Sequence, residues 1–452
     1  MATTTAAFEG DERAGGLDRL LRPFGDVRAG EGVTVLLLLA NIFLILAGYY
    51  VCKTVREPLI LAGGGAEVKS YAAAGQALVL MGFIPLYSWF ASRVDRMRLI
   101  TGVLLFFIVN LELFWLGAKA GIPYLGVAFF VWVGIFNNAV IAQFWSYGND
   151  LFRLETGQRL FPIIAIGATL GSPVGSWLAE RLFDAGVPAY SMLHITAAIL
   201  VVCLGLFRLV EKQEGAKRQR AEALKLEAGA GGFALLARSP YLRLIALLIV
   251  LLNLVNTTGE YILDRALLAE TSARAASIPG FNKEAFIGAF KGDYFFWFSV
   301  MAVVIQALLV SRIVKYLGIA GVVLALPCVA LGAYGAVVAG ATTFAAIRLA
   351  KITENATDYS VMNTARQILW LPTRREEKYK AKQAVDTFVV RTGDVLSAVL
   401  VYLGTTVLAF GTLAFARANL VLVVLWIAVA VLLIREYRAK SDPSQAGSAK
   451  AT

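Results

Sequence analysis

Long apolar runs recur along almost the whole chain, and they restrict its fold more than any other feature. Each can cross the roughly 30 Å hydrocarbon core of a bilayer as a helix, which takes about 20 residues. The chain is 58% hydrophobic and only 16% charged, outside the range of soluble domains. The sequence therefore predicts an all-α, polytopic membrane protein. We expect about twelve spans, near residues 33–53, 71–92, 98–118, 123–147, 160–180, 190–210, 240–263, 292–311, 316–338, 341–366, 384–408 and 415–434.

Side chains for metal, disulfide or nucleophilic chemistry are scarce. The 452 residues include one His and three Cys, and each Cys lies in an apolar run, where it usually acts as a small buried hydrophobe. The sequence contains no His cluster and no glycine-rich phosphate loop followed by Lys-Ser/Thr. We therefore expect no enzyme activity, no metal and no cofactor. Basic loops on one membrane side explain the formal charge of +11 better than a nucleic-acid partner does.

Lysine and arginine concentrate in alternate loops, which sets the expected orientation because cytoplasmic loops are enriched in both. Residues 1–32 are polar and lack the apolar core of a signal peptide, so they are expected to form a cytoplasmic tail. Residues 436–452 are expected to form a second tail on the same side, and residues 264–291 a larger external loop. A charged, then Gly/Ala-rich linker at 211–239 separates two six-helix bundles, 33–210 and 240–435.

A short repeat supports the division into two equivalent halves. The segment ASRVDRMRLITG at 91–102 follows the second span, and VSRIVKYLGIAG at 310–321 follows the eighth. Two parallel six-helix repeats are typical of the major facilitator superfamily, which the chain resembles in this respect. That scaffold implies a central cavity lined by the first, fourth, seventh and tenth spans.

Charged and amide residues gather on these spans and on the eleventh. Charged side chains inside a membrane are costly and usually face a bundle interior or a wet cavity, where they handle charge or substrate. Several here are basic, and the planar donor fork of Arg suits phosphate or carboxylate, so we expect an anionic cargo. The residues expected to bind substrate are Lys53, Arg56, Asn256, Glu260, Lys351, Asp358, Arg366, Arg391 and Asp394.

For single charges, a purely structural role is about equally consistent with the sequence. Arg391 and Asp394 are three residues apart and could neutralise one another on one helix, while Arg56 with Glu57 could anchor the span at the membrane interface. Gly167, Gly171 and Gly175, at four-residue intervals in the fifth span, predict close approach of a second helix.

Several longer segments resemble the nucleotide translocases, the ATP/ADP exchangers of plastids and intracellular bacterial parasites. The resemblance covers nearly the whole membrane region and is most specific at its end. The segments are KTVREPLILAGGGAEVKSY (53–71), FWSYGND (144–150), TGQRLFPIIAIGATLGSPVG (156–175), FKGDYF (290–295), TDYSVMNTARQILWLP (357–372) and KYKAKQAVDTFVVRTGD (378–394).

The resemblance implies particular roles for five positions. The family's important basic residue after the first span falls on Arg56, with Lys53 at the preceding basic position, and its lysine on the eleventh span falls on Arg391. Its two functional carboxylates fall near Val133 and on Asn256, where this chain has no acid. Glu260, one turn later, is the obvious substitute for the second.

The leading hypothesis is a secondary transporter that exchanges ATP/ADP-like nucleotides or related phosphorylated anions by alternating access. We expect it to be a monomer in the lipid bilayer of a bacterial inner membrane, with both termini cytoplasmic. Two alternatives remain open at this stage. One is a major facilitator carrier for another organic anion, and the other is a nucleotide-binding membrane protein that no longer transports.

Overall fold

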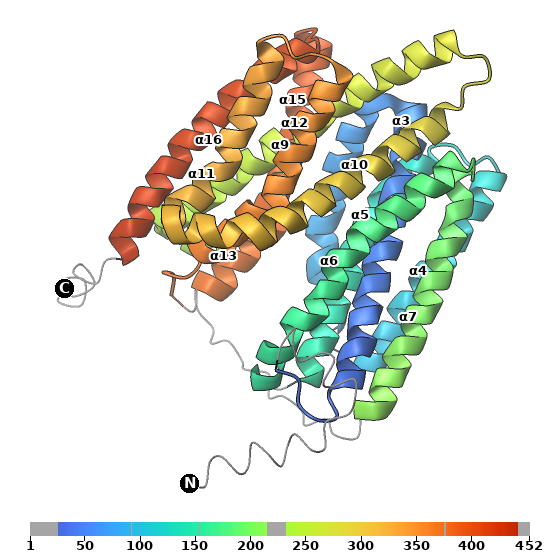
Figure 1. Ribbon diagram of the computed structural model, residues 1–452, viewed down its shortest axis with the longest axis vertical. Helices are drawn as coiled ribbons and strands as arrows, with labels where there is room; N and C mark the ends of the chain where they lie inside the picture. Colours follow the sequence, from blue (N-terminus) through green and yellow to red (C-terminus); the bar gives the residue numbers. More distant parts are fainter. Residues whose placement is uncertain (1–25, 92, 153, 215–231, 375–376, 442–452) are drawn as a thin grey trace. The chain divides into compact units, whose positions relative to one another are not determined.

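Helices occupy nearly all of the computed structural model, which describes residues 26–91, 93–152, 154–214, 232–374 and 377–441 (Figure 1). Within these ranges no residue lies in a strand. Residues 1–25, 215–231 and 442–452, which make up most of the expected tails and linker, lie outside them. The helices are α3 Gly32–Ala91, α4 Arg96–Lys119, α5 Leu125–Leu151, α6 Leu154–Asp184, α7 Leu193–Glu214, α8 Gly232–Arg238, α9 Pro240–Ser277, α10 Lys283–Ile305, α11 Ser311–Val338, α12 Phe344–Thr357, α13 Asn363–Leu369, α14 Lys382–Ala384, α15 Val390–Tyr402 and α16 Thr412–Ser441.

Eight helical stretches among the described residues are long and apolar enough to cross a membrane. Two of them, Gly32–Ala91 and Lys283–Val338, have 60 and 56 residues, more than twice what one crossing needs. Each is broken at a glycine in the left-handed region, Gly65 at φ 76° and Gly318 at φ 59°. Each therefore supplies two of the predicted spans.

The tenth and eleventh predicted spans are helical but interrupted by π-helical turns. Asp358–Met362 separates α12 from α13, and Val385–Val389 separates α14 from α15. Such turns are rare and often occur at functional sites, because they redirect side chains and loosen the backbone hydrogen-bond ladder. Asp358, one of the predicted substrate-binding residues, begins the first of these turns.

Two helices extend beyond the predicted spans. The helix of the first span does not end near residue 53, because α3 continues to its break at Gly65. The expected external loop at 264–291 is mostly helix, since α9 reaches Ser277 and α10 begins at Lys283. Polar residues after an apolar run lower its hydropathy without ending the helix, and the Ala, Leu, Glu and Arg residues after position 264 are good helix formers.

The chain forms two compact units, which divide it differently from the expected bundles. Unit 1 contains residues 1–57, 85–225 and 288–296, and unit 2 contains residues 58–84, 226–287 and 297–452. Residues 58–84 thus belong with the later helices, and residues 288–296 with the earlier ones. Two bundles at 33–210 and 240–435 stay a prediction.

In unit 1, α6 packs tightly against the first part of α3. A side chain at Gly167, Gly171 or Gly175 would collide with the carbonyl oxygen of Leu39, Phe43 or Ala47, respectively. The three glycines therefore let the two backbones touch, as predicted from their spacing. This contact fixes the part of α3 that leads to Lys53 and Arg56.

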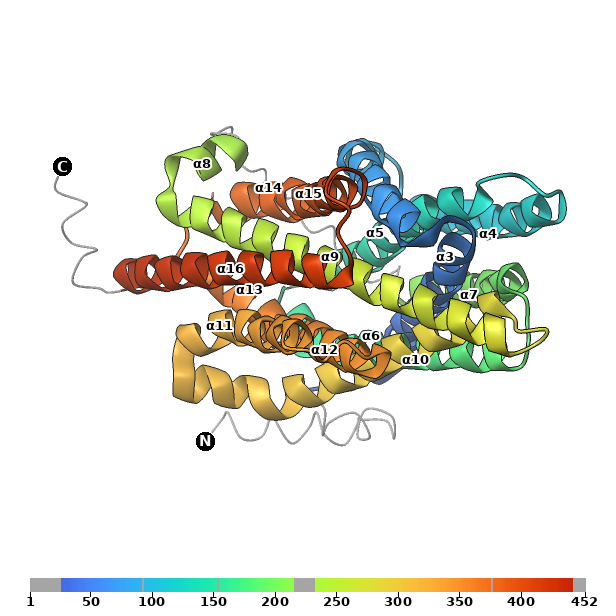
Figure 2. The same cartoon turned by 90° about the horizontal axis from the view of Figure 1, so that it is seen from above.

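In unit 2, α9 is the central helix, with contacts to α12, α15 and α16. Figure 2 shows α9 between α15 on one side and α16 on the other. Gly393 of α15 lies against the backbone of α9, where a Cβ atom would be 3.1 Å from the carbonyl oxygen of Val250. The Asn419 amide of α16 donates to the Val255 carbonyl oxygen at 3.0 Å. These contacts hold α15 and α16 close against α9 within unit 2.

Candidate functional site

Lys53 in unit 1 lies inside α3 with only 9% of its surface exposed. Its Nζ atom is 4.8 Å from the centre of the Tyr50 ring and 4.4 Å from that of Phe295. Aromatic faces carry negative potential and stabilise an ammonium group, more strongly when water is excluded. The two rings therefore stabilise the positive charge of the buried Lys53 side chain.

One turn along α3, Arg56 contacts both an aromatic ring and a carboxylate. Its guanidinium carbon lies 4.4 Å from the centre of the Phe130 ring, and its Nε atom donates to Glu57 Oε1 at 3.1 Å. The other oxygen of Glu57 is 3.6 Å from Nζ of Lys291, a fully buried lysine of α10. We call Lys53, Arg56, Lys291 and Glu57 the cation cluster.

The corresponding network in unit 2 is centred on Lys351 of α12, which is 3% exposed. Its Nζ atom donates to the backbone oxygen of Asn256 at 3.1 Å and to the side-chain Oδ1 of Asn256 at 2.5 Å. It also forms an ion pair with Glu354 at 3.1 Å and lies 3.9 Å from Glu260. Asn355 Nδ2 donates to the same Glu260 oxygen at 2.9 Å, so α9 and α12 are joined by polar contacts.

A third helix, α11, completes this network. The hydroxyl group of Tyr334 donates to Glu354 Oε2 at 2.7 Å. Gly259 of α9 makes room for the contact, because a Cβ atom there would collide with the Tyr334 hydroxyl and lie 3.1 Å from Lys351 Nζ. Buried polar groups are stable when their partners are satisfied. The glycine therefore lets three helices share one charged network.

The remaining predicted residues form two separate ion pairs in unit 2. Arg366 lies 3.6 Å from Asp358 across the π-helical turn. Arg391 lies 3.6 Å from Asp394 on the same helix, and Thr257 of α9 donates to Asp394 at 3.1 Å. All four side chains are less than one-third exposed.

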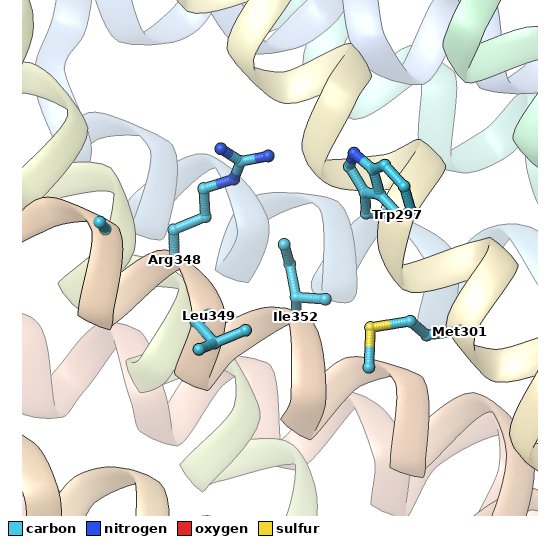
Figure 3. Close-up of a pocket in the computed structure, with 6 residues that line it drawn as sticks. Trp297, Met301, Arg348, Leu349 and Ile352 are labelled. Atoms are coloured by element: carbon cyan, nitrogen blue, oxygen red, sulfur yellow. The ribbon is translucent and has the colours of Figure 1, made fainter.

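A cavity of about 290 Å³ lies between α10 and α12 in unit 2. Figure 3 shows the Arg348 guanidinium and the Trp297 indole extending into the space between these helices, with Met301 and Ile352 below them. Ala345 and Leu349 complete the lining. The cavity thus combines an aromatic surface, a thioether and a cation.

The structure brings some of the predicted residues together. Asn256, Glu260 and Lys351 share one network, whereas Lys53 and Arg56 belong to unit 1. The set selected from sequence omitted Asn355, Glu354 and Glu57, which contact it. It also omitted Tyr334 and Lys291, which contact Glu354 and Glu57, respectively. A lysine within the aromatic run FKGDYFFWF was a signal for Lys291. Tyr334 gave none, since a tyrosine in an apolar span is common.

The sequence is similar to a known transporter family and to individual carrier proteins. A sequence model of the TLC ATP/ADP transporter family matches residues 127–437. The ADP,ATP carrier protein 1 of Chlamydia muridarum is 23% identical over 520 aligned residues, covering 95% of each chain. The protein of the same name from Chlamydia trachomatis is 23% identical over 293 residues, covering 56% of this chain and 53% of the relative.

Solved transporters share the fold at low sequence identity. The nucleoside transporter NupG aligns with a TM-score of 0.65 at 12% identity, covering 89% of this chain and 98% of its own. The POT family transporter PepTSo aligns with a TM-score of 0.63 at 13% identity, covering 91% and 99%. A bacterial homologue of the iron transporter ferroportin gives 0.62 at 16%, with the same coverage. The predicted all-α, major facilitator-like fold class is confirmed.

Proposed function

Because the chain belongs to the TLC ATP/ADP transporter family, we propose that it exchanges nucleotides or closely related phosphorylated anions across a membrane by alternating access. The observation that carries the proposal is a set of buried cations within apolar helices. Lys53 and Arg56 lie on α3, and Lys351 lies in the core of unit 2. Arg391 is the basic residue on the eleventh span.

These cations suit a phosphorylated cargo because phosphate oxygens accept several charge-assisted hydrogen bonds at once. Each cation here already contacts a carboxylate, an amide or an aromatic ring. A phosphate group can therefore take the place of these partners at a cation, so that the charge of the cation stays compensated at low dielectric. We propose Lys53, Arg56, Asn256, Glu260, Lys351, Asp358, Arg366, Arg391 and Asp394 as the residues that contact or shape the route of the cargo.

The cargo itself is argued from two uncharged positions. Val133 is fully buried in α5, and Asn256 is an amide held by Lys351. With no acid at either position, the site presents fewer negative charges to an anion than a site with a carboxylate at both positions would. This favours a phosphorylated cargo but leaves open nucleotides other than ATP and ADP. A carrier for a different organic anion, or a protein that binds nucleotide without transport, is a distinct outcome of the experiment below.

We place the protein in a bacterial inner membrane as a monomer, with both termini in the cytoplasm. The argument for the orientation is the distribution of Lys and Arg, which gather in alternate loops. Two six-helix halves at 33–210 and 240–435 would move against each other during transport. Lipid, rather than a nucleic acid or a second protein, is the expected surrounding partner.

Counter-transport in liposomes tests the proposed function. Purified protein is reconstituted with or without internal ADP, and uptake of labelled ATP, ADP, other nucleotides and sugar phosphates is measured. If the protein is an exchanger, at least one phosphorylated compound should be taken up, and its uptake should depend on the ADP inside the liposomes. Binding of a nucleotide without any uptake would identify a non-transporting protein. Failure of every nucleotide to bind or cross would refute nucleotide exchange.

A further inference from the structure

Lys291 of α10 is a member of the cation cluster that is not among the nine predicted residues. It lies in FKGDYF (290–295), one of the segments that carry the family resemblance, but the resemblance assigns it no role. It is fully buried, with its Nζ atom 3.6 Å from Glu57. Glu57 is itself 1% exposed and accepts from Arg56 at 3.1 Å. One carboxylate therefore lies between two cations from different helices.

The position of Lys291 is set by close packing of α10 against α6. Gly288 and Gly292 lie on either side of it in the sequence. A Cβ atom at Gly288 would lie 2.5 Å from the Phe183 ring, and one at Gly292 would lie 2.9 Å from the backbone of Glu180. A side chain at Gly292 would push the backbones of α10 and α6 apart, and one at Gly288 would displace the buried Phe183 ring, so the backbone that carries Lys291 has little freedom.

The charge of the cluster suggests a role in binding rather than stability. Replacing a buried ion pair by well-packed apolar residues is often neutral or stabilising. The cluster buries Arg56, Lys291 and the Glu57 carboxylate that both contact, so it carries the desolvation cost of several charges and is harder to explain as a stabilising device. Buried ionisable groups in membrane helices are found mainly where charge or substrate is handled.

We propose that Lys291 is a third phosphate-binding residue, and that Glu57 occupies the cations when no cargo is bound. The proposal rests on the proposed function, and it deepens it by assigning the polyphosphate chain of a nucleoside di- or triphosphate to Lys53, Arg56 and Lys291. On binding, phosphate oxygens replace the Glu57 carboxylate at Arg56 and Lys291. On release, the carboxylate returns.

This arrangement predicts opposite effects for the two partners. Lys291→Gln removes a phosphate donor, so it weakens binding of ATP by about 10- to 100-fold, the factor that one charge-assisted hydrogen bond carries. Glu57→Gln removes the competing anion, so it strengthens binding of ATP. Adenosine, which has no phosphate, is affected by neither substitution.

The experiment measures dissociation constants of ATP, ADP, AMP and adenosine for the full-length protein purified in detergent. The variants are Lys291→Gln, Lys291→Arg and Glu57→Gln, each first checked for a single monodisperse peak. Lys119→Gln is the matched control, because Lys119 is a lysine of unit 1 whose side chain is exposed. Its Nζ atom lies 3.8 Å from the centre of the Trp115 ring. Lys291→Arg is expected to keep most of the ATP affinity.

Three results support or overturn the inference. A loss in Lys291→Gln that grows with the number of phosphates, together with retention in Lys291→Arg, supports it. An unchanged ratio of ATP to adenosine affinity in folded Lys291→Gln overturns it. If Lys291→Gln does not fold, Glu57→Gln decides, and ATP affinity at or below the wild-type level overturns the inference. Wild-type protein that binds no nucleotide refutes the proposed function instead.

Discussion

Replacing Lys351 by methionine tests the buried network of unit 2 most directly. Methionine keeps most of the length of the side chain but removes the ammonium group. Glu354, 3% exposed and 3.1 Å from Lys351 Nζ, then retains the Tyr334 hydroxyl bond but loses its cation. The amide oxygen of Asn256 also loses a donor. We therefore expect a large loss of stability rather than a local adjustment.

The expected magnitude follows from the burial of both partners. Removing one member of a buried ion pair costs about 3–5 kcal/mol, because the other charge stays in a region of low dielectric. Replacing both members, in Lys351→Met with Glu354→Gln, removes both charges and should recover most of this loss. The matched control is Arg274→Gln, which breaks the pair of Arg274 with Glu270 near the C-terminal end of α9. That pair is partly exposed, with side chains 48% and 30% accessible, and should contribute less than about 0.5 kcal/mol.

The measurement is thermal unfolding of detergent-purified protein, at one heating rate for all variants because irreversible unfolding depends on that rate. The expected order of melting temperatures is wild type and Arg274→Gln highest, the double variant next, and Lys351→Met lowest. A Lys351→Met protein as stable as Arg274→Gln would refute the buried pair. A double variant no more stable than Lys351→Met would assign the loss to packing rather than to charge.

Three further predictions concern other positions. Gly171→Leu should abolish folded protein, because its side chain collides with the Phe43 carbonyl oxygen, whereas Gly75→Leu, with no atom within 4 Å of its Cβ position, should express normally in a fluorescence-detected chromatography assay. Arg391→Ala should weaken ATP binding in titration calorimetry about 10- to 100-fold by removing one charge-assisted bond, and wild-type affinity would place the cargo elsewhere. Asn256→Glu should create or sharpen ATP/ADP exchange in liposomes, and an unchanged cargo profile would show that this position does not select the substrate.

Hydropathy was enough to predict the membrane class and most of the helices. Apolar runs must be helical because backbone groups in hydrocarbon have no water to bind. Hydropathy could not predict where helices end outside the hydrocarbon, and so α3 was given too short and the α9–α10 connection too long. Glycine spacing predicted the contact of α6 with a second helix, but the sequence alone did not identify α3 as the partner.

The candidate site was predictable in its residue types but not in its pairings. Asn256 and Glu260 are four residues apart, a spacing that puts both on one face of a helix, and both do lie beside Lys351. The contacts of these two residues depend on which helix packs against that face of α9. A rotation of α9 by one residue would change those contacts. Tyr334 takes part because Gly259 lets α11 approach, a consequence of packing rather than of local pattern.

The pairing of the buried charges also bears on why transport should be an exchange. Predicted cations contact carboxylates within their own unit, in the pairs Arg56 with Glu57, Lys351 with Glu354, Arg366 with Asp358 and Arg391 with Asp394. The pairing of Arg391 with Asp394 that the sequence suggested is present as a contact, but it does not compete with transport. A cation that releases an anionic cargo inside a membrane needs another anion at once. That anion is either a second cargo molecule or the neighbouring carboxylate. We expect the strength of the carboxylate contact to determine how strictly outward movement of one anion requires inward movement of another.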